Sequence, residues 1–64
     1  MKYLVSYESH RRSDVIHKLG EYGDIFYESP IINVIGVETE MHKDTIERIV
    51  GVTRVDIGFR GHLY

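Results

Sequence analysis

The hydrophobic pattern of this 64-residue chain switches repeatedly between the period of a strand and the period of a helix, which limits the possible folds. Stretches rich in β-branched and aromatic residues predict strands. Stretches whose apolar residues recur every three or four positions predict helices. Together the two patterns predict strands at residues 2–8, 24–29, 31–40 and 52–59, and helices at residues 9–23 and 41–51.

Side-chain periodicity also predicts which residues face the core. In the first strand Tyr3, Val5 and Tyr7 share one face, because successive side chains of a strand alternate. Leu4 and Ser6 share the other face. Most of the tyrosines at positions 3, 7, 22 and 27 are expected at the edge of the core, with the hydroxyl in water. The apolar stripes of the two helices comprise Val15, Ile16, Leu19, Tyr22, Ile46, Ile49 and Val50.

Glycine, proline and serine mark where these elements are interrupted or end. Pro30 has no amide donor and therefore suits a turn or a sheet edge. Gly36, inside the third predicted strand, indicates a close approach of the backbone or a bulge. Candidate helix-end residues in the first helix are Ser9 or Ser13 at its start and Gly20 or Gly23 at its end.

The predicted order β-α-β-β-α-β fits an α+β fold, the ferredoxin-like plait. Its antiparallel sheet has four strands in the order 4-1-3-2, with both helices on one face. No element of the chain is left to cover the other face, which either stays polar or meets a partner. Depending on register, some of the following residues are expected on this uncovered face: Leu4, Ser6, Phe26, Asn33, Ile35 and Val37.

Composition argues against several classes of function. Ten acidic and eight basic residues give a net charge of −2, and no basic stripe favours nucleic acid. No apolar run approaches the roughly 20 residues that cross a membrane. The chain has no cysteine, so it has neither a disulfide nor a thiolate nucleophile. Nothing resembles a nucleophile elbow, and so short a chain has little room to enclose a substrate. We therefore expect that the protein is not an enzyme and that it binds no cofactor.

The four histidines do not form a metal motif. His10, His17, His42 and His62 show no i,i+3 or i,i+4 spacing, and no cysteine accompanies them. Acidic residues at 21–24 and 38–40 lack the glycine turn and the spacing of a calcium loop. We expect these side chains to lie on the surface and to bind no metal.

Taken in order, the segments of the chain resemble the propeptide of subtilisin-like serine proteases and the stand-alone inhibitors that share its fold. KYLVSYE is similar to the first strand of that family. SDVIHKLGEYGDIFYESPIINVIGVETEM follows with a similar helix, loop and pair of strands. IERIVGVTRVD is similar to the second helix and last strand, and GHLY falls where the mature propeptide ends.

The resemblance implies a function and a set of binding residues. Residues 1–60 would form the propeptide-like domain and residues 61–64 an extended tail in the substrate cleft of the protease. Tyr64 would fill the pocket for the residue before the scissile bond, with Leu63, His62 and Gly61 in the adjacent subsites. Asp56 would cap the N-terminus of a protease helix, where a carboxylate is favourable.

The implied protein is therefore an inhibitor and folding chaperone of a subtilisin-like protease, monomeric when free. The resemblance also implies secretion, although the N-terminal residues MKYLVSYES lack the apolar core and cleavage site of a signal peptide.

Two other functions stay open at the level of the sequence. The first is a plait-fold interaction or regulatory module that acts through its sheet edge or uncovered face, with no protease partner. The second, weaker alternative is a minimal nucleic-acid-binding plait, although the chain lacks the paired strand aromatics and basic residues of the common RNA-binding motif.

Overall fold

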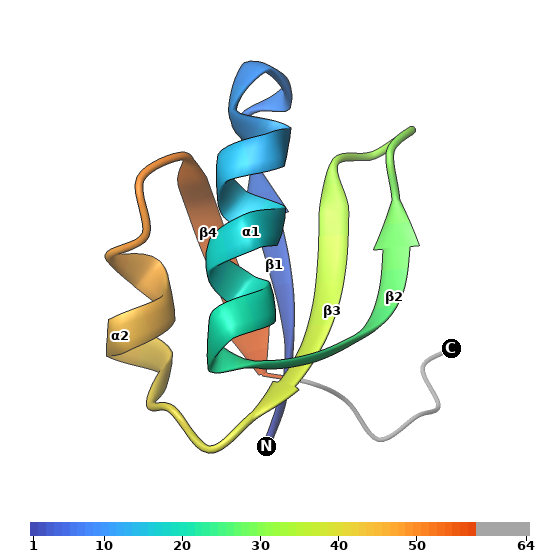
Figure 1. Cartoon of the computed structure of the whole chain (residues 1–64). Coiled ribbons are helices and arrows are strands. Elements are labelled where there is room, and N and C mark those ends of the chain that lie inside the picture. Colours follow the sequence, from blue (N-terminus) through green and yellow to red (C-terminus); the bar gives the residue numbers. More distant parts are fainter. Residues whose placement is uncertain (58–64) are drawn as a thin grey trace.

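A computed structural model describes residues 1–57 and contains four strands and two α-helices in the predicted order (Figure 1). A 3₁₀ turn, η1, precedes the first α-helix. In chain order the elements are β1 (Lys2–Tyr7), η1 (Ser9–Arg11), α1 (Arg12–Tyr22), β2 (Gly23–Ser29), β3 (Val34–Thr39), α2 (Lys43–Glu47) and β4 (Val52–Ile57).

The strands form one antiparallel sheet in the order β2-β3-β1-β4. This is the predicted order 4-1-3-2 counted from the opposite edge. Both helices lie in front of the same face of the sheet (Figure 1). The prediction of an α+β ferredoxin-like plait is therefore confirmed.

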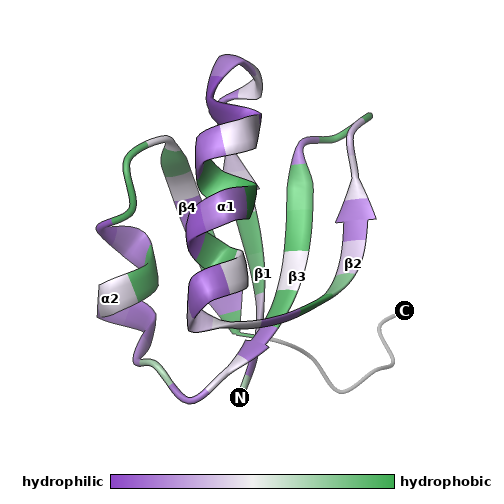
Figure 2. Ribbon diagram, viewed as in Figure 1, coloured by the Kyte–Doolittle hydropathy of each residue, from purple (hydrophilic) through white to green (hydrophobic). Residues whose placement is uncertain are grey.

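The core lies between the helices and the covered face of the sheet. Tyr3 pairs with Val37, and Val5 pairs with Ile35, so these side chains point together toward the helices. In Figure 2 the apolar colouring runs along β3 and the inner side of α1, while polar residues colour the outward turns of both helices. The buried apolar residues are Tyr3, Val5, Tyr7, Val15, Leu19, Ile35, Val37, Ile46, Ile49 and Val55.

The register settles which residues of β3 face away from the helices. Ile35 and Val37, two candidates for the uncovered face, are instead fully buried beneath the helices. Val34 pairs with Ser6 and Gly36 with Leu4, so Val34 and Gly36 occupy the uncovered face. Because side chains alternate along a strand, a shift of one residue exchanges the two faces.

The second helix is shorter than predicted, and this changes the position of Val50. α2 ends at Glu47 rather than continuing to residue 51. Turns over residues 48–51 then lead into β4, with the Val52 amide donating to the Ile49 carbonyl at 3.1 Å. Ile46 and Ile49 remain buried, but the turn carries Val50 outward and leaves it 66% exposed. The assignment of Val50 to the apolar stripe was wrong.

The first helix begins without the predicted serine cap. Ser9 opens the 3₁₀ turn, and neither this turn nor α1 has a side-chain hydrogen bond at its N-cap. The backbone supplies contacts instead, since the Glu8 amide donates to Gly51 at 2.8 Å and the Arg11 amide donates to Glu8 at 2.8 Å. Gly23 occupies the C-cap position, as one of the two alternatives predicted.

The hydroxyls of the two buried tyrosines of β1 differ, which yields a stability prediction. Tyr3 donates to the Met41 carbonyl at 2.9 Å, whereas the buried Tyr7 hydroxyl has no partner within residues 1–57. An unpaired buried hydroxyl costs free energy, so we expect Tyr7→Phe to leave stability unchanged or raise it by up to about 1 kcal/mol. Tyr3→Phe is expected to lower stability by about 1 kcal/mol.

Urea denaturation of the two variants measures the difference. A loss for Tyr7→Phe as large as that for Tyr3→Phe would show that a buried water satisfies the Tyr7 hydroxyl.

Candidate protein-binding face

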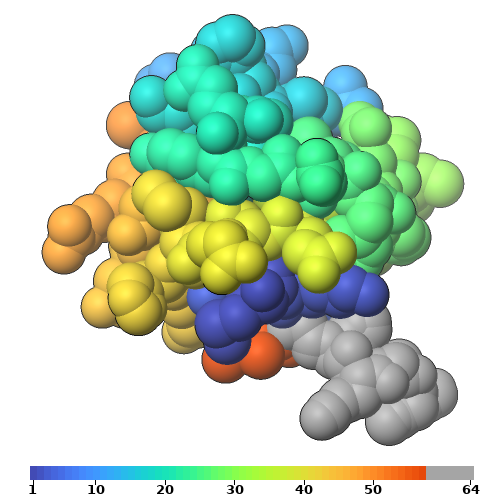
Figure 3. Space-filling view, turned by 60° about the horizontal axis from the view of Figure 1, so that its bottom comes forward, coloured from blue at the N-terminus to red at the C-terminus, as the bar shows by residue number. Residues whose placement is uncertain are grey.

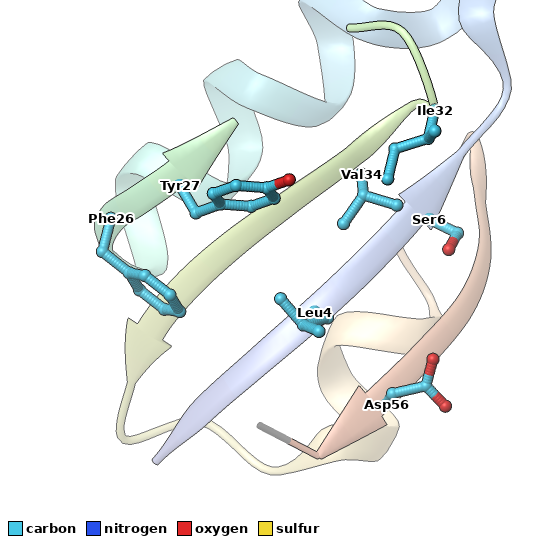
Figure 4. A pocket seen from close by; sticks show the side chains of 7 residues that line it. All are labelled: Leu4, Ser6, Phe26, Tyr27, Ile32, Val34 and Asp56. Carbon is cyan, nitrogen blue, oxygen red and sulfur yellow. The ribbon is translucent and has the colours of Figure 1, made fainter. Parts of the chain in front are cut away.

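The uncovered face of the sheet, here called the open face, carries an irregularity in β2. Ile25 pairs with Val37 and Tyr27 pairs with Gly36, so Phe26 is the extra residue of a β-bulge. A bulge interrupts strict alternation. Phe26 and Tyr27, although adjacent in sequence, therefore lie on the same face, and they are 44% and 45% exposed. Figure 4 shows both rings on the open face.

Gly36 makes room for this arrangement. A β-carbon at Gly36 would lie 2.7 Å from the Cζ atom of Phe26 and 3.0 Å from the Cβ atom of Tyr27. The Phe26 ring thus lies against bare backbone of β3. A bulge is present beside Gly36, as one of the two alternatives predicted, but it lies in β2 rather than in β3, and the group that approaches Gly36 most closely is the side chain of Phe26.

The aromatic pair borders a shallow pocket of ≈ 370 Å³ on the open face. Its lining comes from all four strands and from the turn between β2 and β3, as Figure 4 shows. Ser6 and Asp56 are its polar members, and they lie on the β1 and β4 side. The lining residues are Leu4, Ser6, Phe26, Tyr27, Ile32, Val34 and Asp56.

The turn at residues 30–33 extends the apolar surface beyond the pocket. Ile31 is 90% exposed and Ile32 is also largely exposed. Asn33 has a φ of 56°, in the left-handed region that asparagine tolerates, and its carbonyl accepts from the Tyr7 amide at 3.1 Å. Pro30 therefore does lie in a turn, which presents two isoleucines to the surface.

Charged groups lie around the pocket. Asp56 pairs with Leu4 across the sheet, and its Oδ1 accepts from Arg54 Nε at 3.2 Å. The Asp56 side chain remains 47% exposed. On the β1 side Lys2 Nζ lies 5.4 Å from the centroid of the Phe26 ring, within cation–π range. An apolar centre with a charged surround is typical of a protein-binding surface.

The predicted site residues fall into two groups. Asp56 lies on the open face, close to the end of β4. In Figure 3 the end of β4 lies beside the start of β1, in agreement with the pairing of Tyr3 with Ile57. The tail residues Gly61, His62, Leu63 and Tyr64 lie outside the described residues, as do the last predicted residues of strand 52–59.

Sequence reasoning placed Phe26 among the candidates for the open face but assigned Tyr27 to the edge of the core. Tyr3 and Tyr7 are in fact fully inside the core, and Tyr27 is a surface residue of the pocket. The signal that could have revealed this was present, since Gly36 indicated a bulge and two adjacent aromatics stood on the neighbouring strand.

Two of the three histidines within residues 1–57 each lie near a single carboxylate. His10 Nε2 lies 3.4 Å from Glu8, and His17 Nε2 lies 3.3 Å from Glu21. In this part of the chain no three histidine, aspartate or glutamate side chains gather as a metal site would require. None of the described helices has the length and apolarity to span a membrane.

Comparisons of the chain with family models, with curated proteins and with solved structures find no match. The functional interpretation therefore depends on the chemistry of the open face and on the resemblance of the sequence.

Proposed function

We propose that this protein is an inhibitor and folding chaperone of a subtilisin-like serine protease, binding through its open face with residues 61–64 in the substrate cleft. One observation gives the strongest support for this proposal. The open face combines an exposed aromatic pair, an apolar pocket and the half-exposed carboxylate of Asp56 near the end of β4, the strand that leads toward residues 61–64.

Inhibition follows from the way an extended peptide binds a protease. Main-chain hydrogen bonds hold the segment along the edge of the cleft, and alternate side chains enter pockets. Leu63 and Tyr64 supply large apolar side chains for those pockets. The open face adds contact area outside the cleft, with the Asp56 carboxylate at the N-terminus of a protease helix.

Chaperone activity follows from the same binding. A partner that binds the folded protease and not the unfolded chain stabilises the folded state by mass action. The sheet of this protein offers a preformed apolar surface, on which an incompletely folded protease can bury its own apolar surface.

An inhibition assay tests the proposal directly. A purified subtilisin is assayed on a chromogenic peptide substrate with increasing concentrations of this protein. We expect competitive inhibition, because residues 61–64 and the substrate occupy the same cleft. Full activity at the highest soluble concentration of this protein would refute the proposal.

A plait-fold interaction module without a protease partner is the second candidate. The observation that favours it is the sheet order, in which the outer edges of β2 and β4 have no neighbouring strand within residues 1–57. Free edges can pair with a strand of another chain. Analytical ultracentrifugation distinguishes the candidates, since a stable homodimer without any effect on subtilisin favours this one.

Replacing the carboxylate of Asp56 tests its assigned role. A carboxylate at a helix N-terminus contributes about 0.3–1 kcal/mol, so Asp56→Asn is expected to raise the inhibition constant by about two- to fivefold. The effect should diminish as salt increases. Asp44→Asn, on α2 in the helix layer, is the matched control and should leave inhibition unchanged. Equal inhibition constants for Asp56→Asn and the unsubstituted protein would remove Asp56 from the interface.

A further inference from the structure

We propose that the β-bulge at Phe26, accommodated by Gly36, determines which partner fits the open face. The two aromatic rings border a pocket that accepts one large apolar side chain of the partner. This inference rests on the proposed function, since the partner is the protease surface. It adds Phe26 and Tyr27 as contact residues, and it adds Gly36 as a positioning residue that acts through Phe26.

The position of the Phe26 ring depends on its neighbours on β3 and β1. Gly36 leaves the space beneath the ring, and any larger residue would place a β-carbon 2.7 Å from it. Lys2 Nζ lies 5.4 Å from the ring centroid and favours the same position. The ring itself is only half-buried and does not belong to the core. It can therefore be displaced while the core keeps its packing.

The lining of the pocket identifies the chemistry of the group that it binds. Phe26, Tyr27 and Leu4 meet Ile32 and Val34 around its apolar side. An aliphatic or aromatic side chain would exclude water from these groups, whereas a charged group would lose its hydration without a partner. The carboxylate of Asp56 on the opposite side adds a requirement for a hydrogen-bond donor or a positive charge nearby. The partner therefore presents one large apolar side chain beside such a donor.

Three variants and one control test this inference in the subtilisin inhibition assay. Phe26→Ala is expected to weaken inhibition by about 30-fold, the loss typical of a central interface side chain. Gly36→Ala keeps the ring but displaces it, and should weaken inhibition by a smaller but measurable factor. In the double variant, Gly36→Ala should cause no loss of inhibition beyond that caused by Phe26→Ala. The effects of residues that act through one contact are not additive. Ile31→Ala, more exposed but outside the pocket lining, should change inhibition by less than about twofold.

The possible results separate the two proposals. If the unsubstituted protein does not inhibit, both the proposed function and this inference fail. If it inhibits and Phe26→Ala inhibits equally well, only this inference fails. If Gly36→Ala weakens inhibition as much in the Phe26→Ala background as alone, Gly36 does not act through Phe26. Urea denaturation of each variant identifies any loss that comes from unfolding.

Two other occupants of the pocket have distinct signatures in NMR spectra of the free protein. If the chain's own residues 58–64 fill it, deleting residues 61–64 will shift the Phe26 and Tyr27 ring resonances. If a second copy fills it, dilution will shift them. Either result would contradict the proposal that the pocket is empty in the free protein and is filled by the protease. We expect the ring resonances to be unchanged in both experiments.

Discussion

Deleting residues 61–64 is expected to weaken inhibition of a subtilisin by about 100-fold or more. Burying one large apolar side chain contributes about 1.5–3 kcal/mol. Leu63 and Tyr64 together therefore contribute at least about 3 kcal/mol, which corresponds to roughly 100-fold in an inhibition constant. Lost main-chain hydrogen bonds along the cleft add to the effect. The measurement is the inhibition constant of the full chain against that of a chain ending at Arg60.

The shortened chain provides its own control for folding. The sheet, both helices and the core cluster described above form within residues 1–57, so we expect the same urea midpoint with and without residues 61–64. A shortened chain that is equally stable and inhibits equally well would show that these residues do not enter the cleft.

Within residues 1–57, Gly51→Ala is expected to cause the largest loss of stability of any single glycine substitution outside the sheet. Gly51 has a φ of 101°, in the region that favours glycine. A β-carbon there would lie 2.6 Å from Arg11 Cβ and 3.0 Å from Val15 Cγ2. Backbone strain of about 1–3 kcal/mol and overpacking of about 1–3 kcal/mol add to roughly 2–6 kcal/mol. Native proteins have total stabilities of only about 5–15 kcal/mol, so the variant should lose a large share of its free energy of unfolding.

Gly20→Ala is the matched control for this prediction. Gly20 lies inside α1, and a β-carbon there would meet nothing within 4 Å. Alanine in a helix interior is favoured over glycine, so this variant should gain about 0.5–1 kcal/mol. Circular dichroism with urea denaturation measures both variants. A Gly51→Ala protein as stable as the unsubstituted chain would contradict the described packing of the 48–51 turn against Arg11 and Val15.

The sequence predicted the order of elements well because strands and helices have different hydrophobic periods. It did not determine the register of the third strand. Residues 34–37 read Val-Ile-Gly-Val, so apolar residues stand on both faces, and only pairing with Tyr3 and Val5 places Ile35 and Val37 in the core. Val50 was misplaced for a similar reason, since the apolar pattern continues beyond Glu47 but the helix does not.

The candidate site was partly predictable. The uncovered face could be predicted, because the predicted order of elements places both helices on one face of the sheet. Asp56 was predicted from the resemblance of the sequence to subtilisin propeptides. The aromatic pair did not follow from periodicity, because the bulge at Phe26 breaks the alternation on which such predictions depend. Tail residues Gly61, His62, Leu63 and Tyr64 remain a prediction from the sequence, because they lie outside the described residues.

The most direct test of the central claim is methyl and aromatic NMR of this protein bound to a subtilisin whose catalytic serine is replaced by alanine. If the open face is the binding surface, resonances of Leu4, Phe26, Tyr27, Ile32 and Val34 should shift on binding. The methyls of Val50, exposed beside the helices, should not. Shifts at Val50 with unchanged open-face resonances would contradict the claim.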